Sequence, residues 1–364
     1  MGKPIIKAMQ IAAAYIGTVV GAGFATGQEI LRFFTIYQGW GLLGIAITAV
    51  LFIILGTKMM VLSHRINAYS YQEFNINLFG RKIGNLINAL LTVVLLGVTG
   101  VMVSATGAIF NEQLGYSPYL GIFISTALCY LLIQKGLQSI LTVNSIVVPM
   151  ILTFCLIIFT QTGIAGLYAQ LGQIFPSLSP PSISPPISAP ITLNTDGGHW
   201  LISALSYAAF NLAMAQAVLV PMGRDVQNEK TLIAGGILGG IGLGFMLFCS
   251  HMALYTILPD ALTYDIPMAF IVKTISPLAL FLFLAVVYGE VFTTLIGNVF
   301  GLTRQLKSLT HMPEKSIIAI ILLLSMIISQ VGFSALVSHL YPIFGYASLI
   351  LLLCLTLKKL PKKR

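Results

Sequence analysis

Four glycines and a carboxylate occur close together near the start of this chain, in the stretch GTVVGAGFATGQE from Gly17 to Glu29. In a helix that crosses lipid, a break in the backbone is tolerated only where it lines a protein-buried or water-filled cavity. Glycine suits such a break because it accepts unusual dihedral angles and lets a ligand approach closely. The freed N–H groups would face an anion and the freed carbonyl groups a cation. The predicted binding residues are Gly21, Ala22, Gly23, Phe24, Thr26, Gln28 and Glu29. The alternative is that the glycines only allow helices to pack closely.

Two carboxylates lie within apolar segments, where a charge at the bilayer centre costs roughly 2.5 to 3.5 kcal/mol on insertion scales. Glu29 precedes Arg32 by three residues, which places both side chains on one helix face. Three roles stay open for Glu29: pairing with Arg32, recognition of an amine, or carriage of a proton. Glu290 has no basic residue near it in the sequence, so removal from water would favour its neutral, protonatable form. Glu290 and Glu29 are therefore the candidates for proton coupling.

Three further polar side chains interrupt later apolar segments. Asn211 and Gln216 lie in the segment 199–221, where small residues precede Asn211 and a second, weaker helix break is expected. Asn211 is assigned to the same binding site, and the alternative for both amides is a hydrogen bond to a neighbouring helix. His251 lies toward one end of its segment, either as an interfacial, hydrogen-bonded histidine or as a proton relay.

The elements that must position these residues are membrane helices. Hydrophobic residues make up 57% of the 364 residues, charged residues 8%, and the mean hydropathy is +0.95. Apolar runs of about 20 residues, each long enough for roughly 30 Å of hydrocarbon, indicate one all-α bundle rather than several soluble domains. The ten expected spans are 5–36, 39–63, 83–110, 119–134, 139–165, 199–221, 231–257, 277–303, 316–336 and 340–357. The four cysteines lie within these runs without metal-ligand spacing and are interpreted as buried apolar side chains.

An even number of spans places both termini on one side of the membrane. If that side is the cytoplasm, seventeen of the 19 Lys and Arg residues lie there, and only Arg32 and Lys273 lie outside. This is the asymmetry of the positive-inside rule. The sequence therefore predicts a multi-pass plasma-membrane protein with both termini in the cytoplasm. The net charge of +9 comes from these basic residues, whose placement orients the protein in the membrane, so no nucleic-acid partner is expected.

A segment rich in Pro and Ser, residues 166–198, separates two halves of five spans each, 1–165 and 199–364, the second ending in a basic cytoplasmic tail. The segment contains PSLSPPSISPPISAP and no Lys or Arg, which favours an extended external linker. Because five crossings reverse the direction of the chain, the halves would insert with opposite topology, as in transporters built from inverted repeats. Residues 67–80 predict either a short amphipathic helix at the cytoplasmic interface or an ordinary loop.

The string TVVGAGFATGQEILRFF resembles the signature of the YkvI-like membrane proteins, a bacterial group placed in the amino acid, polyamine and organocation (APC) superfamily. The similarity extends over most of the chain. It implies the five-plus-five inverted-repeat fold first described in the leucine transporter LeuT, with the first and sixth helices broken. It also implies that backbone amides of the first helix hold an amino-acid carboxylate and that sodium binds between the first and eighth helices.

The stretch from Phe292 to Thr294 is similar to the paired-hydroxyl motif of that ion site. The resemblance therefore implies a sodium site in which Thr293 and Thr294 join backbone carbonyls from Gly17 to Val20. The alternative for these threonines is a hydrogen bond to a carbonyl one turn earlier in their own helix.

These observations predict a secondary active transporter of a small organic solute, an amino acid or related amine, coupled to sodium or protons by alternating access. The rival is a transporter-like nutrient receptor that binds a small molecule and signals without moving it. No Ser-His-Asp set, phosphate loop, metal cluster or haem motif is present in the sequence, so an enzyme is not expected. The expected partners are a small-molecule substrate and the lipid bilayer, and sodium is the only ion considered as a cofactor.

Overall fold

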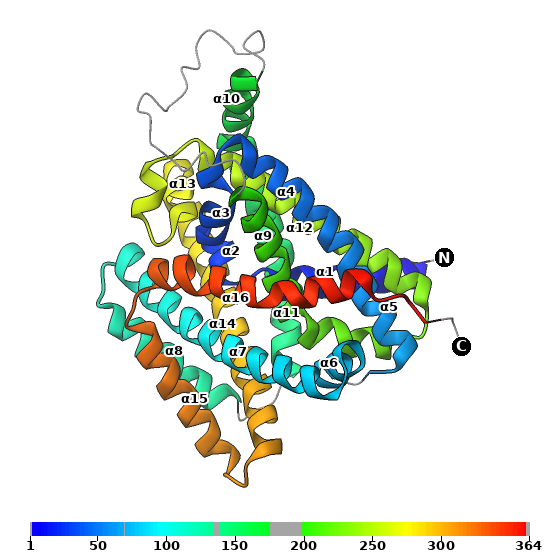
Figure 1. Ribbon diagram of the computed structural model, residues 1–364. Coiled ribbons are helices and arrows are strands. Elements are labelled where there is room, and N and C mark those ends of the chain that lie inside the picture. The colour runs from blue at the N-terminus through cyan, green and yellow to red at the C-terminus, as the bar shows by residue number, and fades with distance from the viewer. Residues whose placement is uncertain (1, 69, 134–137, 175–198, 362–364) are drawn as a thin grey trace.

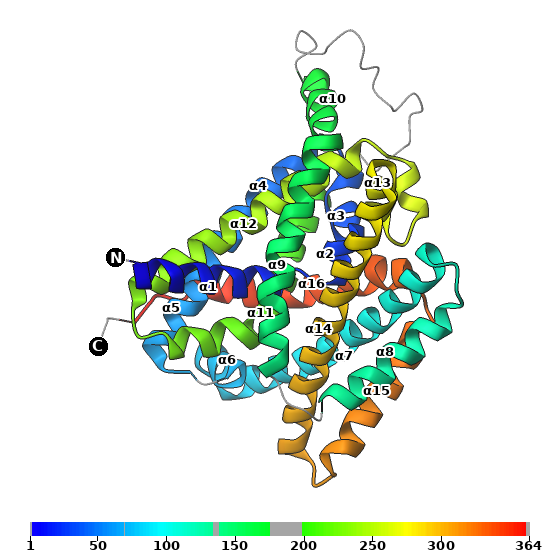
Figure 2. The same ribbon diagram turned by 180° about the vertical axis from the view of Figure 1, so that it is seen from behind.

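The computed structural model describes residues 2–68, 70–133, 138–174 and 199–361. Within these ranges the chain is built of helices, and no strand is formed. The helices gather into a bundle from which α10 projects at one end (Figure 1). Both views place the start of α1 and the end of α16 on the same side of that bundle (Figures 1 and 2).

In chain order the helices are α1 (Gly2–Val19), α2 (Ala22–Thr26), α3 (Gln28–Phe33), α4 (Gly39–Leu51), α5 (Thr57–Ile66), α6 (Tyr71–Phe79), α7 (Arg81–Ala108), α8 (Pro118–Ile133), α9 (Gln138–Ile158), α10 (Ile164–Ile174), α11 (His199–Asp225), α12 (Glu229–Tyr255), α13 (Pro267–Ile275), α14 (Pro277–Leu309), α15 (Glu314–Ser329) and α16 (Phe333–Leu357). Short π-helical turns join α4 to α5 and α9 to α10, and another, Ile109–Gln113, ends α7. Each predicted span overlaps at least one of these helices.

In the described part of the chain, seven helical stretches are long and apolar enough to cross a membrane. They are Gly39–Ile66, Arg81–Gln113, Val147–Gln170, His199–Asp225, Glu229–Tyr255, Pro277–Lys307 and Phe333–Leu357. Two shorter apolar helices are Ile5–Val19 and Pro118–Ile133. The protein is therefore a multi-pass, helical membrane protein.

The predicted break in the segment 199–221 is wrong. α11 runs without interruption from His199 to Asp225, and Pro221 is accommodated near its end. Alanine is the best helix former, and the segment contains several alanines but no glycine before Gly223, so nothing in it favours an interruption. The two halves of the chain therefore differ at the helices that were expected to be broken alike.

The start of the predicted external linker is also wrong. Residues 166–174 continue α10 instead of forming an extended segment, because the first proline of this region is Pro176. The remainder of the prediction, residues 175–198, lies outside the described residues. The boundary between the last two predicted spans moves as well: the chain turns at Gly332, so α16 begins at Phe333.

Within the segment 67–80, Tyr71–Phe79 form helix α6, so a short helix, one of the two interpretations expected, is present. The helix buries one face, which includes Phe74 and Asn75, and exposes Glu73, Ile76 and Asn77 on the other. It packs mainly along α7 and also touches α11 and α16. Ser70 begins it by accepting a hydrogen bond from the Glu73 N–H, a common N-cap arrangement.

Two groups of helices pack more closely within themselves than with each other. α1, α4, α5, α11 and α12 form the first group, in which α1 lies along α12 and α11 packs against α5 and α4. α7, α8, α14 and α15 form the second group. α16 packs against both α11 and α7 and so connects the groups. The candidate site lies where the groups meet.

Candidate functional site

The first span is interrupted twice within its hydrophobic stretch. The last helical hydrogen bond of α1 joins Val20 N–H to the Ile16 carbonyl at 2.8 Å, and Gly21 is extended, with φ −120° and ψ −168°. α2 then begins, and Gly27 ends it in the left-handed region at φ +89°. A Cβ on Gly27 would lie 2.8 Å from Met268 Cγ, so both the dihedral angle and the space require glycine. The interruption falls where the glycines of the sequence predict it.

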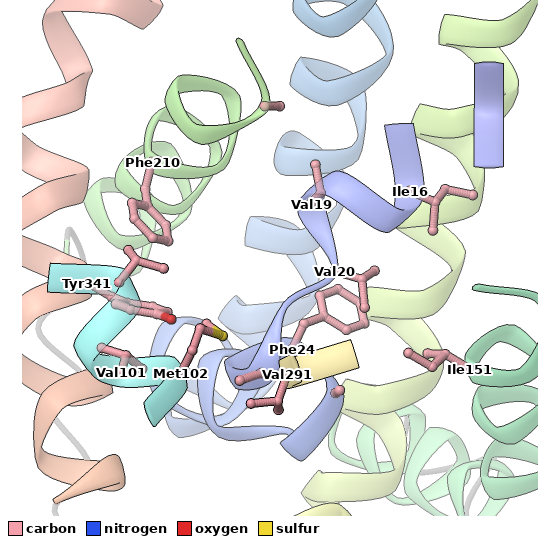
Figure 3. Packing of buried hydrophobic residues seen from close by; sticks show 14 of the residues in the cluster. Ile16, Val19, Val20, Phe24, Val101, Met102, Ile151, Phe210, Val291 and Tyr341 are labelled. Atoms are coloured by element: carbon pink, nitrogen blue, oxygen red, sulfur yellow. The ribbon is translucent and has the colours of Figure 1, made fainter. Parts of the chain in front are cut away.

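The interruption is surrounded by buried apolar side chains from helices of both groups (Figure 3). Val20 and Phe24 lie beside Val291 of α14, and Met102 of α7 lies nearby. Opposite them, Tyr341 of α16 faces Phe210 of α11, with 4.7 Å between the ring centroids. A ligand held by the backbone at this break would therefore meet mostly apolar and aromatic surroundings.

Glu29 brings a carboxyl group to this apolar region. It is only 3% exposed, and its side chain lies against Gly23, where a Cβ would be 2.8 Å from Glu29 Cδ. Oε2 of Glu29 has no hydrogen-bond partner. The phenols of Tyr207 and Tyr341 are close enough to interact with the carboxylate electrostatically, and Tyr207 is the nearer candidate for a hydrogen bond to it, although its hydroxyl makes no hydrogen bond of normal length and angle. The Glu29 carboxyl and the Tyr207 hydroxyl therefore have unused capacity for a ligand or a proton.

Pairing with Arg32, one of the three roles considered for Glu29, is not formed. Arg32 Nη2 instead donates to Ser334 Oγ at the start of α16, at 3.2 Å. The pairing fails because Glu29 packs back against α2, whereas Arg32 reaches toward a helix that is distant in sequence. Of the three roles considered for Glu29, recognition of an amine and carriage of a proton remain.

The Gln28 side chain hydrogen-bonds to other elements of the protein, so its amide group is already occupied. Its side chain is fully buried, Nε2 donates to the Tyr264 carbonyl, and Oε1 accepts a hydrogen bond from Ser334 Oγ at 3.5 Å. Thr26 and Asn211 also use their side chains locally. Thr26 Oγ1 donates to the Gly23 carbonyl at 3.3 Å, and Asn211 Nδ2 donates to the Tyr207 carbonyl of its own helix at 3.1 Å.

A second set of hydrogen bonds closes the end of the bundle beyond Gln28. Asp265 Oδ1 accepts from Ser334 N–H at 3.2 Å, and Glu112 Oε2 accepts from the N–H groups of Asp265 and Ile266 at 2.6 and 3.2 Å. Burial raises the pKa of Asp265, and the hydrogen bond from Ser334 opposes that shift. Sequence reasoning missed Ser334, Asp265 and Glu112, because they come from three elements and no local spacing connects them.

Glu290 lies in α14 with its side chain fully buried and neither carboxyl oxygen hydrogen-bonded. Thr293 Oγ1 donates to the Glu290 carbonyl at 3.1 Å, which is the local hydrogen bond considered as the alternative for this threonine. Thr294 is half-buried. α14 packs against α2, and its residue Val291 lies beside Phe24 (Figure 3). The helix that carries Glu290 thus borders the interruption.

His251 is buried within the protein and does not lie at its surface. Its two ring nitrogens lie 3.0 Å from Gln170 Nε2 and 3.0 Å from Thr35 Oγ1, and Thr35 Oγ1 is also 3.2 Å from the Ile30 carbonyl. Because the Gln170 amide donates to Nε2, Nδ1 carries the proton and donates to Thr35. Both nitrogens are occupied in this arrangement, which favours a structural histidine over a proton relay. Gln216, by contrast, is fully buried with neither amide atom hydrogen-bonded.

The sodium site expected from Gly17, Val20, Thr293 and Thr294 has suitable chemistry. The helical ladder of α1 ends with the Ile16 carbonyl, so the carbonyls from Gly17 onward are available at the helix end. Carbonyl and hydroxyl oxygens are hard ligands of the kind that small cations prefer. Within the described residues, no group of three or more His, Cys, Asp or Glu side chains is arranged to hold a metal ion.

Comparison with known sequences gives one matching family and two similar proteins. A sequence model of the spore permease family, described as spore germination protein, matches residues 5–192. The uncharacterized membrane protein YkvI of Bacillus subtilis (strain 168) is 41% identical over 359 residues, 98% of each chain. YyaD of the same strain is 26% identical over 346 residues, 94% of each chain.

Comparison with solved structures gives membrane transporters at low sequence identity. A sodium-coupled sialic acid symporter superimposes with a TM-score of 0.59 at 12% identity, covering 94% of this chain and 77% of its own. A manganese transporter of Eremococcus coleocola reaches a TM-score of 0.64 at 13% identity, covering 97% and 78%. The inward-facing form of Mhp1 reaches 0.60 at 14% identity, covering 94% and 73%. At these identities the likeness shows the fold, which is that of the LeuT-fold transporters. The chain itself belongs, by its sequence, to the spore permease family of spore germination proteins.

Proposed function

We propose that this protein is a secondary active transporter of a small organic solute, an amino acid or related amine. The observation that carries the proposal is the interruption of the first span at Gly21, which leaves backbone groups without helical partners deep in the bundle. Such interruptions are where LeuT-fold transporters bind their solutes, and irregular backbone at this depth is otherwise costly. The binding residues proposed are Gly21, Ala22, Gly23, Phe24, Thr26, Gln28, Glu29 and Asn211.

Within this set, we assign Glu29 to the amino group of the solute. The carboxylate has an unpartnered oxygen and lies near two phenols, and a cation held there would gain a hydrogen bond as well as a charge partner. Thr26 and Gln28 already bond within the protein, so they contribute to binding by holding the shape of the break. Asn211 donates to the Tyr207 carbonyl within α11, which leaves its side-chain oxygen for the solute. Phe24, Phe210 and Tyr341 would enclose the apolar part of the solute.

Coupling to an ion gradient is assigned to α14. Glu290 is a buried carboxyl group without a hydrogen-bond partner, which suits a group that takes up and releases a proton. The alternative is sodium held by Gly17, Val20, Thr293 and Thr294, since Thr293 Oγ1 keeps its lone pairs while it donates to Glu290. Glu29 is the second candidate for the proton.

The proposed topology is ten spans in two inverted halves, in the plasma membrane, with both termini in the cytoplasm. Seventeen of the 19 basic residues would then be cytoplasmic, which supports this orientation. Alternating access would arise from motion between the two helix groups, because α1 and α11 belong to one group and α7 and α14 to the other.

The test is thermal unfolding of the purified protein with individual amino acids and amines, in sodium or in a bulky organic cation. Solute at 100 times its dissociation constant adds about 2.7 kcal/mol to stability, which is detectable. Glu29→Gln should abolish the shift, whereas Glu314→Gln, at an exposed position, should leave it intact. Proteoliposomes should then accumulate the stabilising solute. A shift that persists in Glu29→Gln would remove Glu29 from the site.

A nutrient receptor is the second candidate, and the family match favours it. The matching family is described as spore germination protein, a description that names germination rather than a transported solute. A receptor would keep the pocket and lose the coupled transport. Saturable stabilisation by a solute, without uptake or exchange in proteoliposomes, would therefore support the receptor over the transporter.

A further inference from the structure

The chain at the end of α16 lies against helix α5 and is bound to it by two basic side chains. Lys58 Nζ donates to the Thr356 carbonyl at 2.9 Å. Arg65 Nη1, about two helical turns further along α5, donates to the Pro361 carbonyl at 2.6 Å. The last part of α16 and the residues that follow it therefore run along the end of α5.

Two further contacts fix this arrangement. Lys358 Nζ donates to the Asn77 carbonyl of α6 at 3.0 Å. Arg65 also forms an ion pair with Glu229 at the start of α12, in which Nη2 lies 2.7 Å from Oε1. Residues 356–361 are thus bound directly to α5 and α6, and Arg65 connects them to α12.

This part of the chain is strongly basic. Five of the seven residues from Lys358 to Arg364 are Lys or Arg, and none of the seven is acidic. Lys359 is exposed. The ammonium groups of Lys58 and Lys358 each donate to one carbonyl, and an ammonium has three N–H groups, so each can donate to a further acceptor. Three ammonium groups are therefore available to an anion at this end of α16.

Exposed apolar side chains lie directly beside these ammonium groups. Leu353 and Leu357, one turn apart in α16, are 56% and 71% exposed, and Leu360 is 39% exposed. α16 is one of the helices long and apolar enough to cross a membrane, and it ends at Leu357. The leucines therefore lie where acyl chains end, and the lysines lie at the level of the headgroups. A phospholipid matches this pairing of apolar and basic groups, whereas a small soluble anion matches only the basic part.

We propose that the end of α16 binds an anionic phospholipid. Lys58, Lys358 and Lys359 would donate to the phosphate diester, and Leu357 and Leu360 would contact the acyl chains. With both termini in the cytoplasm, as proposed above, this lipid belongs to the cytoplasmic leaflet, whose negative surface attracts basic segments beside a membrane helix. The site requires that α16 crosses the membrane and does not depend on transport of a solute.

The test is native mass spectrometry of the purified full chain, titrated with phosphatidylglycerol or with zwitterionic phosphatidylcholine of the same acyl chains. The first phosphatidylglycerol should bind more tightly than phosphatidylcholine. Lys359→Gln should raise its dissociation constant about fivefold, the factor that corresponds to about 1 kcal/mol for one basic residue near an anionic surface. Lys315→Gln removes the same charge from an exposed position of α15, away from α5 (Figure 1), and should leave the constant unchanged. Equal effects of the two substitutions, or equal affinity for the two lipids, would overturn the site.

A second pair of variants tests whether the site needs the contact between Arg65 and Pro361. Arg65→Gln with Glu229→Gln breaks this contact without changing the net charge, and it should weaken phosphatidylglycerol binding severalfold. Glu314→Gln with Lys315→Gln is the matched control, since it also removes one charge of each sign, from exposed positions of α15. Equal dissociation constants in the two double variants would contradict a site built by the packing of this segment against α5.

Inorganic phosphate distinguishes a lipid site from a general anion site. Phosphate has no acyl chain to contact Leu357 and Leu360, so it should not displace phosphatidylglycerol at an equal concentration. Displacement would refute the lipid site. Because these measurements need no solute, tight binding of phosphatidylglycerol by a protein that moves no solute would retain this site and refute transport alone.

Discussion

The carboxyl group of Glu29 lies in the space that a side chain on Gly23 would occupy. A Cβ built on Gly23 overlaps the Glu29 side chain and lies 2.8 Å from its Cδ. Position 23 requires glycine because the Glu29 side chain lies directly over it. The absence of a side chain on Gly23 in turn allows Glu29 to pack in this position. This relationship connects α2 and α3 across the turn at Gly27 and positions the only carboxylate that α2 and α3 contain.

Gly23→Ala should displace the Glu29 side chain and weaken any ligand that the carboxylate binds. Overpacking of this kind costs about 1 to 3 kcal/mol, so the unfolding temperature should also fall. Gly297→Ala is the matched control, since a Cβ at that helical position meets nothing within 4 Å. The control should be neutral or slightly stabilising in the same thermal assay. If both variants unfold alike, the contact between Glu29 and Gly23 has no energetic importance.

Gly27→Ala should be more destabilising than Gly115→Ala. Both glycines have positive φ, +89° and +70°, so an alanine at either is strained by roughly 1 kcal/mol or more. Only Gly27 also meets a close neighbour, Met268 Cγ at 2.8 Å, whereas Gly115 has nothing within 4 Å. Thermal unfolding of the two variants measures the difference directly. Equal losses would mean that Met268 moves aside and that the backbone strain alone matters.

The part of the fold that sequence predicted best is the part set by local chemistry. Apolar runs located the helices, and the glycines of the first span located its interruption, because dihedral angles and hydropathy are local properties. The expected break in α11 failed because it was carried over from the first span by analogy, whereas the residues near Asn211 favour a continuous helix.

The contacts that close the site could not be predicted in the same way. Ser334 receives bonds from Arg32 and meets Asp265 and Gln28, yet these residues are separated by tens to hundreds of positions in the chain. The partner of a polar side chain in a bundle depends on how helices pack, and a single sequence contains no direct record of that packing. For the same reason, the spacing of Glu29 and Arg32 allowed a pair but could not reveal that Arg32 bonds to Ser334.

Asp265→Asn should flatten the dependence of stability on pH just above 3.8, the ordinary pKa of this group. Burial raises the pKa in the folded protein, so the folded state binds the proton more tightly than the unfolded state. Stability from this group is therefore present below pH 3.8 and lost as the pH rises through the higher folded pKa. Asparagine keeps an oxygen to accept from Ser334 N–H. Unfolding temperatures across this pH range test the effect, and Asp260→Asn, exposed in the same loop, should keep the native profile.

Glu290→Gln should abolish the coupling of transport to a proton gradient without lowering the stability of the protein. The side chain is buried without a hydrogen-bond partner, so an amide of the same shape should leave the unfolding temperature within a few degrees of the native value. In proteoliposomes, a proton gradient should no longer drive accumulation of the solute, although exchange of solute across the membrane should continue. Thr293→Val with Thr294→Val is the counterpart, and it should abolish a dependence on sodium while leaving a proton-driven process intact. Accumulation that survives both changes would exclude α14 as the coupling helix and would leave Glu29 as the group that carries the proton.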